Sequence, residues 1–117
     1  MPDLAGRRVI VTGAGGFIGA NLVRALLERG ALVTGVVRPG SNPWRLAEVE
    51  DELDLVPADA PVPGALEDAV TRARPELAVH LALPAGHPQT FSERLEQLET
   101  SVLGTARLLE ALAVAGC

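Results

Sequence analysis

Three glycines near the amino terminus, Gly13, Gly16 and Gly19, have the spacing that most clearly implies chemistry. They lie between an apolar run at residues 7–12, which is typical of a strand, and a helical pattern that follows. A glycine-rich turn at such a junction brings backbone N–H groups and a helix N-terminus up to a phosphate group. We expect Gly13 to form the tight turn, Gly16 to let the backbone approach a pyrophosphate, and Gly19 to let the helix pack closely on the strand. The pattern predicts dinucleotide binding.

The spacing of these glycines is G-x-x-G-x-x-G, which alone is a weak pattern, so the neighbouring elements decide its meaning. Ile18, Leu22 and Leu26 recur at intervals of four residues and predict a helix over residues 16–29, which Gly30 ends. The alternative is a glycine-rich strand–helix turn that binds no ligand. The strand before the turn and the helix after it favour the dinucleotide interpretation.

The end of the second predicted strand bears on which dinucleotide is bound. An NAD site needs a carboxylate there to accept hydrogen bonds from the ribose hydroxyls, whereas an NADP site needs a cation for the 2′-phosphate. Val37 is followed by Arg38, with no acidic residue beside it, and Arg45 comes seven residues later. These arginines favour NADP, with NAD as the alternative. If Arg38 instead stacks on the adenine or is only solvated, it gives no preference.

The rest of the chain alternates between strand and helix patterns. Strands are predicted at residues 7–12, 31–37, 54–58 and 77–83, helices at 16–29, 63–74 and 91–115, a short helical piece at 43–50, and loops at 38–42 and 84–90. The strands read as continuous apolar runs, which is typical of a parallel sheet covered on both faces. Right-handed crossovers then give a doubly wound α/β fold of the Rossmann type, with strand order 3-2-1-4, in one domain over residues 1–117.

The composition excludes several classes of protein. The chain has 117 residues and a net charge of −5 with no basic cluster, so we expect no nucleic-acid partner. No apolar run is long enough to span a membrane and no signal peptide precedes the first strand, so we expect a cytoplasmic protein. Cys117 is the single cysteine, which excludes an internal disulfide and offers no metal-ligand spacing.

Both histidines and the last helix have an interpretation in this fold. His80, in the fourth strand, is expected to be a core or strand-end histidine whose hydrogen bonds are satisfied. His87 falls in a loop above the carboxyl ends of the strands, where it is solvated or contacts a substrate. On the last helix, apolar positions step by three and four and predict the buried face: Leu95, Leu98, Val102, Thr105, Leu109 and Leu112. Leu103 and Leu108 lie off this stripe.

Four segments, in the expected order, carry a resemblance to a known family. Residues 12–19 match the motif T-G-x-x-G-F-I-G, Asp59 follows the third predicted strand, residues 80–82 read H-L-A, and residues 102–111 contain V-x-G-T-x-x-L-L-E-A. Over essentially its whole length the chain resembles the extended short-chain dehydrogenase/reductases, the nucleotide-sugar epimerase and dehydratase group.

The resemblance implies what the chain binds. The implied cofactor site comprises Gly13, Gly16, Phe17, Ile18, Gly19, Arg38, Asp59, Ala60, Leu81, Ala82 and Leu83. In that family the aspartate meets the adenine amino group, and the V-R-x-x-S loop at residues 37–41 is similar to that of NADP-using dehydratases. The implied substrate is a small molecule such as a nucleotide-sugar. Family members commonly form homodimers through the helix that corresponds to residues 91–115.

The chain departs from the family pattern in ways that concern catalysis. Leu83 replaces the second alanine of H-L-A-A, and Ser101 replaces an asparagine that helps hold the active-site water and the backbone geometry. The family's general acid/base is the tyrosine of a Tyr-x-x-x-Lys pair, but this chain contains no tyrosine and its ten basic residues are all arginine. We therefore assign no catalytic residue and expect the first part of a longer enzyme, without the C-terminal strands and the substrate domain. The alternatives are a non-catalytic binding or interaction module and one half of a split enzyme.

Overall fold

We describe the fold from a computed structural model that covers residues 3–84 and 86–117. Four strands, β1 (Arg8–Thr12), β2 (Leu32–Val37), β3 (Asp54–Pro57) and β4 (Leu77–His80), form a parallel sheet in the order β3-β2-β1-β4. The helical segments are α1 (Phe17–Glu28), the 3₁₀ helix η1 (Trp44–Glu52), α2 (Ala65–Ala73), α3 (Phe91–Leu98), the π-helical segment η2 (Glu99–Leu103) and α4 (Gly104–Val114). The predicted strand order 3-2-1-4 is confirmed.

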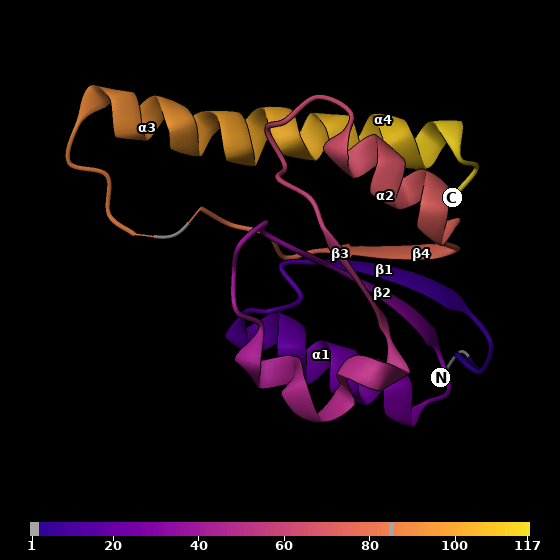
Figure 1. The fold of residues 1–117 in the computed structure, drawn as a ribbon. Helices are drawn as coiled ribbons and strands as arrows, with labels where there is room; N and C mark the ends of the chain where they lie inside the picture. Colours follow the sequence, from indigo (N-terminus) through magenta and orange to yellow (C-terminus); the bar gives the residue numbers. More distant parts are fainter. Residues whose placement is uncertain (1–2, 85) are drawn as a thin grey trace.

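Helices cover both faces of the sheet, as the predicted doubly wound fold requires (Figure 1). α1 and η1 lie against one face, where Val9 of β1 packs in a cluster with Val23 of α1. α2 and α4 lie against the other face, where Ile10 packs in a second cluster with Leu66 and Leu108. Alternate residues of β1 therefore point into two separate cores, and the sheet is the middle one of three layers.

β4 is shorter than the predicted strand at residues 77–83, because it ends at His80. Its partner strand β1 ends at Thr12, which pairs in register with His80, and the chain then turns away at Gly13 with φ +68°. The two N–H groups that follow His80 bond to the Thr12 hydroxyl. The strand prediction was therefore wrong for residues 81–83, which form an irregular segment beside the glycine turn.

The helix predicted over residues 91–115 is observed as α3, η2 and α4 in succession, and its buried face differs from the predicted one. The buried residues are Gly104, Leu108 and Ala111. Most apolar side chains of the predicted stripe are exposed instead: Leu95, Leu98, Val102 and Leu109. The prediction that this stripe packs first of all in the core was wrong.

A close contact at Gly104 explains which face of this helix is buried. A Cβ added to Gly104 would lie 2.9 Å from the Cβ of Ala60, so glycine allows the helix to approach the loop after β3 this closely. The exposed stripe and the buried face lie one residue apart along the same helix, and periodicity alone does not distinguish two such faces. Leu108, which was predicted to lie off the stripe, is only 2% exposed because it belongs to the face that Gly104 presents.

α3 extends beyond the sheet and overhangs the carboxyl ends of the strands (Figure 1). All its residues are exposed except Gln97, which is half-buried. The helix begins with a capping box, in which the Thr90 side chain accepts the N–H of Glu93 and the Glu93 carboxylate accepts the N–H of Thr90. Because α3 buries so little surface, its own capping residues stabilise its first turn.

The remaining boundaries agree with the predictions to within two residues. Gly64, with φ +89°, precedes α2, which therefore begins two residues later than the helix predicted over residues 63–74. The helical piece predicted at 43–50 is η1, and residues 38–42 form a loop. In the predicted loop 84–90, residue 85 lies outside the described residues. Within the part of the chain that the structure describes, no helix is both long and apolar enough to cross a membrane.

Candidate functional site

A cleft of about 1070 Å³ lies at the carboxyl ends of the strands. Its lining comes from the glycine turn after β1, the loops after β2 and β3, the segment after β4, and parts of α3 and η2. The neighbouring strands β1 and β4 are followed by helices that pack on opposite faces of the sheet, α1 on one and α4 on the other, so the loops after these two strands diverge. Such a switch point is where open α/β sheets bind their ligands.

Gly13 and Gly19 have the structural roles that their spacing predicts. Gly13 has φ +68°, and a Cβ there would lie 2.8 Å from backbone atoms of Leu81 and Ala82. A Cβ on Gly19 would lie 2.1 Å from the carbonyl oxygen of Gly13, a distance that no side chain tolerates. Glycine is therefore needed at position 13 for both its φ and the close approach of the segment after β4, and at position 19 for helix packing.

Gly16 lies where the cleft meets the N-terminus of α1. It is the N-cap residue, and a Cβ there would meet one described heavy atom within 4 Å, the Gly13 carbonyl oxygen at 3.4 Å. Its side of the turn therefore faces open space. The backbone N–H groups of Phe17 and Ile18 begin the first helical turn, in which N–H groups have no intrahelical partner. Together with the helix dipole, these donors favour an anion in the cleft.

Arg38 stands at the rim of the cleft on a tight turn. The carbonyl of Arg38 accepts the N–H of Ser41 at 3.1 Å and the Ser41 hydroxyl at 2.6 Å. Pro39 and Gly40, with φ +76° at Gly40, are the residue types of a type II turn. The turn fixes the Arg38 backbone, and its exposed guanidinium is the cationic group that the loop after β2 presents to the cleft.

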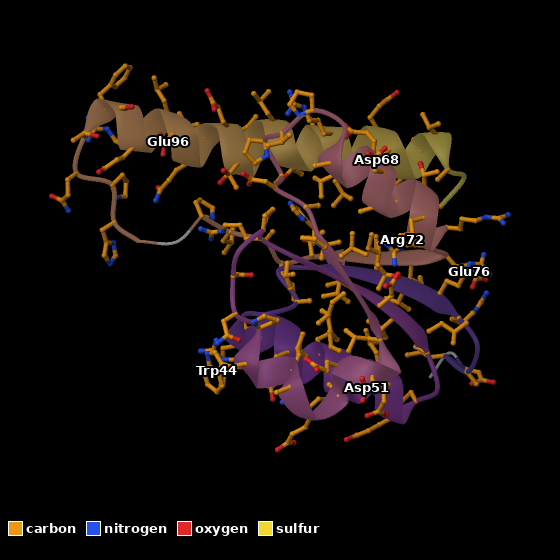
Figure 2. All side chains as sticks on the ribbon, viewed as in Figure 1. Trp44, Asp51, Asp68, Arg72, Glu76 and Glu96 are labelled. Atoms are coloured by element: carbon orange, nitrogen blue, oxygen red, sulfur yellow. The ribbon has the colours of Figure 1, made fainter. Side chains whose placement is uncertain are left out.

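Arg45 brings a second guanidinium close to the glycine turn. Its Nη1 donates to the Gly15 carbonyl at 3.4 Å, and its guanidinium stacks on the Trp44 ring at 4.4 Å from the ring centroid. Figure 2 shows Trp44 in the layer formed by α1 and η1, and its chain neighbour Pro43 lines the cleft. Arg24 of α1 donates to the Arg45 carbonyl, so this arginine is held on both its backbone and its side chain.

Asp59 and Ala60 line another side of the cleft, directly after β3. Asp59 is half-buried and Ala60 is buried beneath the start of α4. The N–H of Ala58 donates to the carbonyl of Val37 at 2.9 Å, so this loop runs beside the loop that carries Arg38. The residues predicted to recognise the adenosine part of a dinucleotide are therefore on adjacent loops.

The segment after β4 is held by two threonines and a histidine. The Thr12 hydroxyl accepts the N–H groups of Leu81 at 3.1 Å and Ala82 at 3.2 Å. Both ring nitrogens of His80 are hydrogen-bonded, Nδ1 to the Thr12 hydroxyl at 2.6 Å and Nε2 to the Thr105 hydroxyl at 3.0 Å. Burial lowers the pKa of His80. The expectation of a satisfied strand-end histidine is confirmed.

Sequence reasoning had not singled out Thr12 and Thr105 for this contact. Each stands next to a glycine, in the T-G of residues 12–13 and the G-T of residues 104–105. These two dipeptides could have indicated the contact. A glycine marks a close approach between backbones, and the threonine hydroxyl beside it is then near enough to another element to form a hydrogen bond.

The predicted site residues do not all lie in the cleft. Those that line it are Gly13, Gly16, Arg38, Asp59, Ala60, Leu81, Ala82 and Leu83. Gly19 is buried behind the turn, whereas the side chains of Phe17 and Ile18 are 72% and 68% exposed. Phe17 and Ile18 follow the cleft-lining Gly16 but do not themselves line the cleft. His87 lies in the predicted loop and lines the cleft.

The polar groups of the described residues differ from those of a metal site. Among residues 3–84 and 86–117, no group of three or more His, Cys, Asp or Glu side chains could hold a metal ion. The glycine turn and the Arg38 guanidinium line one part of the cleft and suit a phosphate, whereas acidic side chains line other parts: Asp59, Glu93, Glu96 and Glu99.

The comparisons with known proteins agree with the fold. The chain is 31% identical over 111 residues to a dTDP-L-rhamnose 4-epimerase from Burkholderia thailandensis, covering 92% of this chain and 31% of that protein. It is 41% identical over 113 residues to a 3-diazoavenalumate denitrifying reductase from a Streptomyces species, covering 93% of this chain and 34% of that protein. The chain thus spans about a third of the length of these curated relatives.

A solved structure and a family model give the same assignment. The Bordetella bronchiseptica enzyme WbmG in complex with NAD and UDP matches with a TM-score of 0.82 and 25% identity, covering 99% of this chain and 37% of that one. The model of the NAD dependent epimerase/dehydratase family matches residues 9–117. Since this match runs from β1 to the last residue, the chain belongs to the NAD dependent epimerase/dehydratase family.

Proposed function

We propose that this chain binds NADP, with NAD as the alternative, in the cleft at the carboxyl ends of the strands. The observation that carries the proposal is the meeting of three features in one cleft: the glycine turn, the N-terminus of α1, and the Arg38 guanidinium. Gly13 and Gly19 leave no room for side chains, whereas the space beside Gly16 is open. This is the arrangement that a pyrophosphate with an adjoining adenosine requires.

Each group has a role in holding the dinucleotide. The N–H groups at the start of α1 bind the pyrophosphate, and Gly16 lets it approach. Arg38 binds the 2′-phosphate, and Arg45, which is stacked on Trp44, is close enough to the turn to add a second positive charge. Asp59 accepts a hydrogen bond from the adenine amino group, and the segment after β4 forms the wall of the cleft. When bound, the cofactor supplies hydride transfer at its nicotinamide.

We also propose that the chain is the NAD(P)-binding domain, residues 1–117, of an enzyme that epimerises, dehydrates or reduces a nucleotide-sugar or a similar carbonyl or alcohol. The printed names of the relatives, which include an epimerase and a reductase, support this class. Because the chain spans about a third of their length and has no tyrosine or lysine, we assign it cofactor binding and no catalytic residue. A non-catalytic module and one half of a split enzyme are the alternatives.

The exposed stripe on the last helix supports a homodimer. Leu98, Val102 and Leu109 are each more than half exposed on one face of η2 and its flanking helices, and Leu95 continues that face into α3. An apolar stripe of this kind is normally covered by a partner. Sedimentation equilibrium tests the dimer: Leu98→Glu is expected to give a monomer, and an unchanged mass would contradict the proposed interface.

We also propose that the protein is cytoplasmic and has no nucleic-acid partner.

Titration of the chain with NADPH and NADH tests the cofactor proposal. Trp44 is the only tryptophan, and it follows Pro43, which lines the cleft, so its fluorescence reports binding through energy transfer to the reduced nicotinamide. We expect Arg38→Ala to weaken NADPH binding by roughly 10- to 150-fold, which corresponds to the loss of about 1.5–3 kcal/mol from a charged hydrogen bond. NADH binding is expected to change little.

The control variant is Arg29→Ala, because Arg29 is an exposed arginine that follows the C-terminal end of α1, away from the cleft. We expect this variant to bind both dinucleotides as the unmodified chain does. Equal losses of NADPH and NADH affinity in Arg38→Ala would remove the 2′-phosphate role, and absence of binding to either dinucleotide would overturn the proposal as a whole.

A further inference from the structure

A continuous series of side-chain hydrogen bonds links the last helix to the glycine turn. It runs from the carbonyl of Ser101, in η2, to the hydroxyl of Thr105, then through the imidazole of His80 to the hydroxyl of Thr12. The distances along it are 2.5, 3.0 and 2.6 Å. The members come from β1, β4 and the helix above them, so the series joins three elements at the inner end of the cleft.

The number of donors and acceptors on each side chain fixes which group donates in each hydrogen bond of this series. A hydroxyl has one proton to donate, and Thr105 donates its proton to the Ser101 carbonyl. Thr105 therefore accepts from His80, which requires the proton on Nε2. In the neutral ring Nδ1 is then an acceptor, so Thr12 donates its hydroxyl proton to Nδ1.

The direction leaves both acceptor sites of the Thr12 oxygen for the backbone. The N–H groups of Leu81 and Ala82 donate to these two sites at 3.1 and 3.2 Å, and the Leu81 N–H is shared with the Thr12 carbonyl at 3.2 Å. The peptide between Leu81 and Ala82 is the one that packs against Gly13, whose missing Cβ would lie 2.8 Å from it. If Nδ1 carried the proton, the Thr12 oxygen would have to accept a third hydrogen bond, and a hydroxyl oxygen has only two acceptor sites. The Leu81 N–H keeps the Thr12 carbonyl as a partner in either case, so the bond that depends on the Nε2–H tautomer is the one from the Ala82 N–H, which belongs to this peptide.

We infer that His80 is a positioning residue that works as the neutral Nε2–H tautomer, fixing the 81–82 peptide against the glycine turn and coupling dinucleotide affinity to Thr105 at the start of α4. The inference rests on the proposed function, because its consequence is read in dinucleotide binding. It assigns His80 no contact with substrate. The residue acts through Thr12, and Thr105 selects the tautomer.

The first test is the tautomer itself, which is independent of any ligand. The chain contains two histidines, so a ¹⁵N-labelled sample gives two sets of ring signals, and a His87→Asn variant identifies those of His80. We expect the pattern of a neutral ring with its proton on Nε2. A ring protonated on Nδ1, or on both nitrogens at neutral pH, would overturn the inference.

The second test removes the acceptor that selects the tautomer. Thr105→Val keeps the shape of the side chain, and we expect about a tenfold loss of NADPH affinity together with a shift of the His80 ring signals away from the pure Nε2–H pattern. Thr105→Ser restores the hydroxyl and is expected to recover both. A purely structural role for Thr105 would not move the ring signals.

The matched control is Thr71→Val, because the Thr71 hydroxyl makes the same type of bond to the carbonyl four residues earlier, to Glu67 at 2.9 Å on α2. It is expected to bind NADPH as the unmodified chain does. If the unmodified chain binds no dinucleotide, the proposed function fails while the tautomer remains measurable. If the chain binds but Thr105→Val matches Thr71→Val, the inference fails. Should Thr105→Val not fold, the Thr105→Ser variant and the tautomer measurement decide.

Discussion

The N-termini of α1 and α3 meet the same physical requirement in different ways. The first N–H groups of any helix lack intrahelical partners. In α3, the Thr90 side chain accepts the N–H of Glu93 at 3.1 Å, and the Glu93 carboxylate accepts the N–H groups of Gln89 at 2.5 Å and Thr90 at 3.1 Å. In α1, the N-cap is Gly16, which has no side chain to offer, and the first turn contains no acidic residue.

The difference follows from how each helix is held in place. α1 buries Gly19, Ala20, Val23 and Leu26 against the sheet, so packing stabilises it without a cap. α3 is almost fully exposed, so its capping box has to stabilise its first turn. Tertiary packing thereby frees the N–H groups at the start of α1 for an anion, and Gly16, the N-cap residue of that helix, lines the cleft.

The turns before the two helices give the largest expected effect. Gly13, before α1, and Gly86, before α3, both have positive φ, +68° and +85°. An alanine at Gly86 would meet no described atom within 4 Å, so we expect a loss of about 1–2 kcal/mol from the left-handed backbone. Gly13→Ala adds the clash with the 81–82 peptide and is expected to lose about 2–5 kcal/mol. Urea unfolding measures both, and equal losses would contradict the close approach.

A cap added to α1 is the second test. Asp and Asn are comparable N-cap residues, so Gly16→Asp and Gly16→Asn should both fold. The carboxylate repels a pyrophosphate whereas the amide does not, and we expect Gly16→Asp to bind NADPH at least about tenfold more weakly than Gly16→Asn. The same fluorescence titration measures this ratio. If the two variants bind equally, the start of α1 does not hold an anion.

Local chemistry explains what the sequence could predict. The roles of Gly13 and Gly19 could be predicted because only glycine combines an easily adopted positive φ with the absence of a Cβ. Apolar runs also mark the strand before these residues and the helix after them. The strand order follows from the alternation of strands and helices and the handedness of crossovers. These features depend on residues near one another in the chain.

The features that sequence reasoning missed depend on contacts across the fold. The buried face of the last helix is set by the approach of Gly104 to Ala60, which periodicity within the helix does not encode. The end of β4 at His80 is set by where its neighbour β1 turns. The partners of His80 come from residues 68 positions before it and 25 positions after it. Such pairings become visible only when the sheet and the helix layer are assembled.

The smallest expected effect is the response of the two helix starts to acid, which we expect to differ between α3 and α1. The N–H groups of Gln89 and Thr90 lower the pKa of Glu93 below its usual value of 4.5. A lowered folded-state pKa means that this carboxylate stabilises the start of α3 fully above about pH 4.5, and that the stabilisation is lost as pH falls through the folded-state pKa. Amide hydrogen exchange of α3 is expected to accelerate in that range beyond its intrinsic pH dependence.

Glu93→Gln provides the control, because glutamine can complete the same capping box and has no charge to lose. We expect this variant to keep α3 protected and to remove the acid-dependent loss. α1 has no carboxylate in its first turn, so its amides are expected to show no corresponding change. Two outcomes would show that acid weakens the whole fold rather than one cap: an equal loss of amide protection in α1, or an unchanged loss in Glu93→Gln. The contrast between the two helix starts would then not extend to their response to pH.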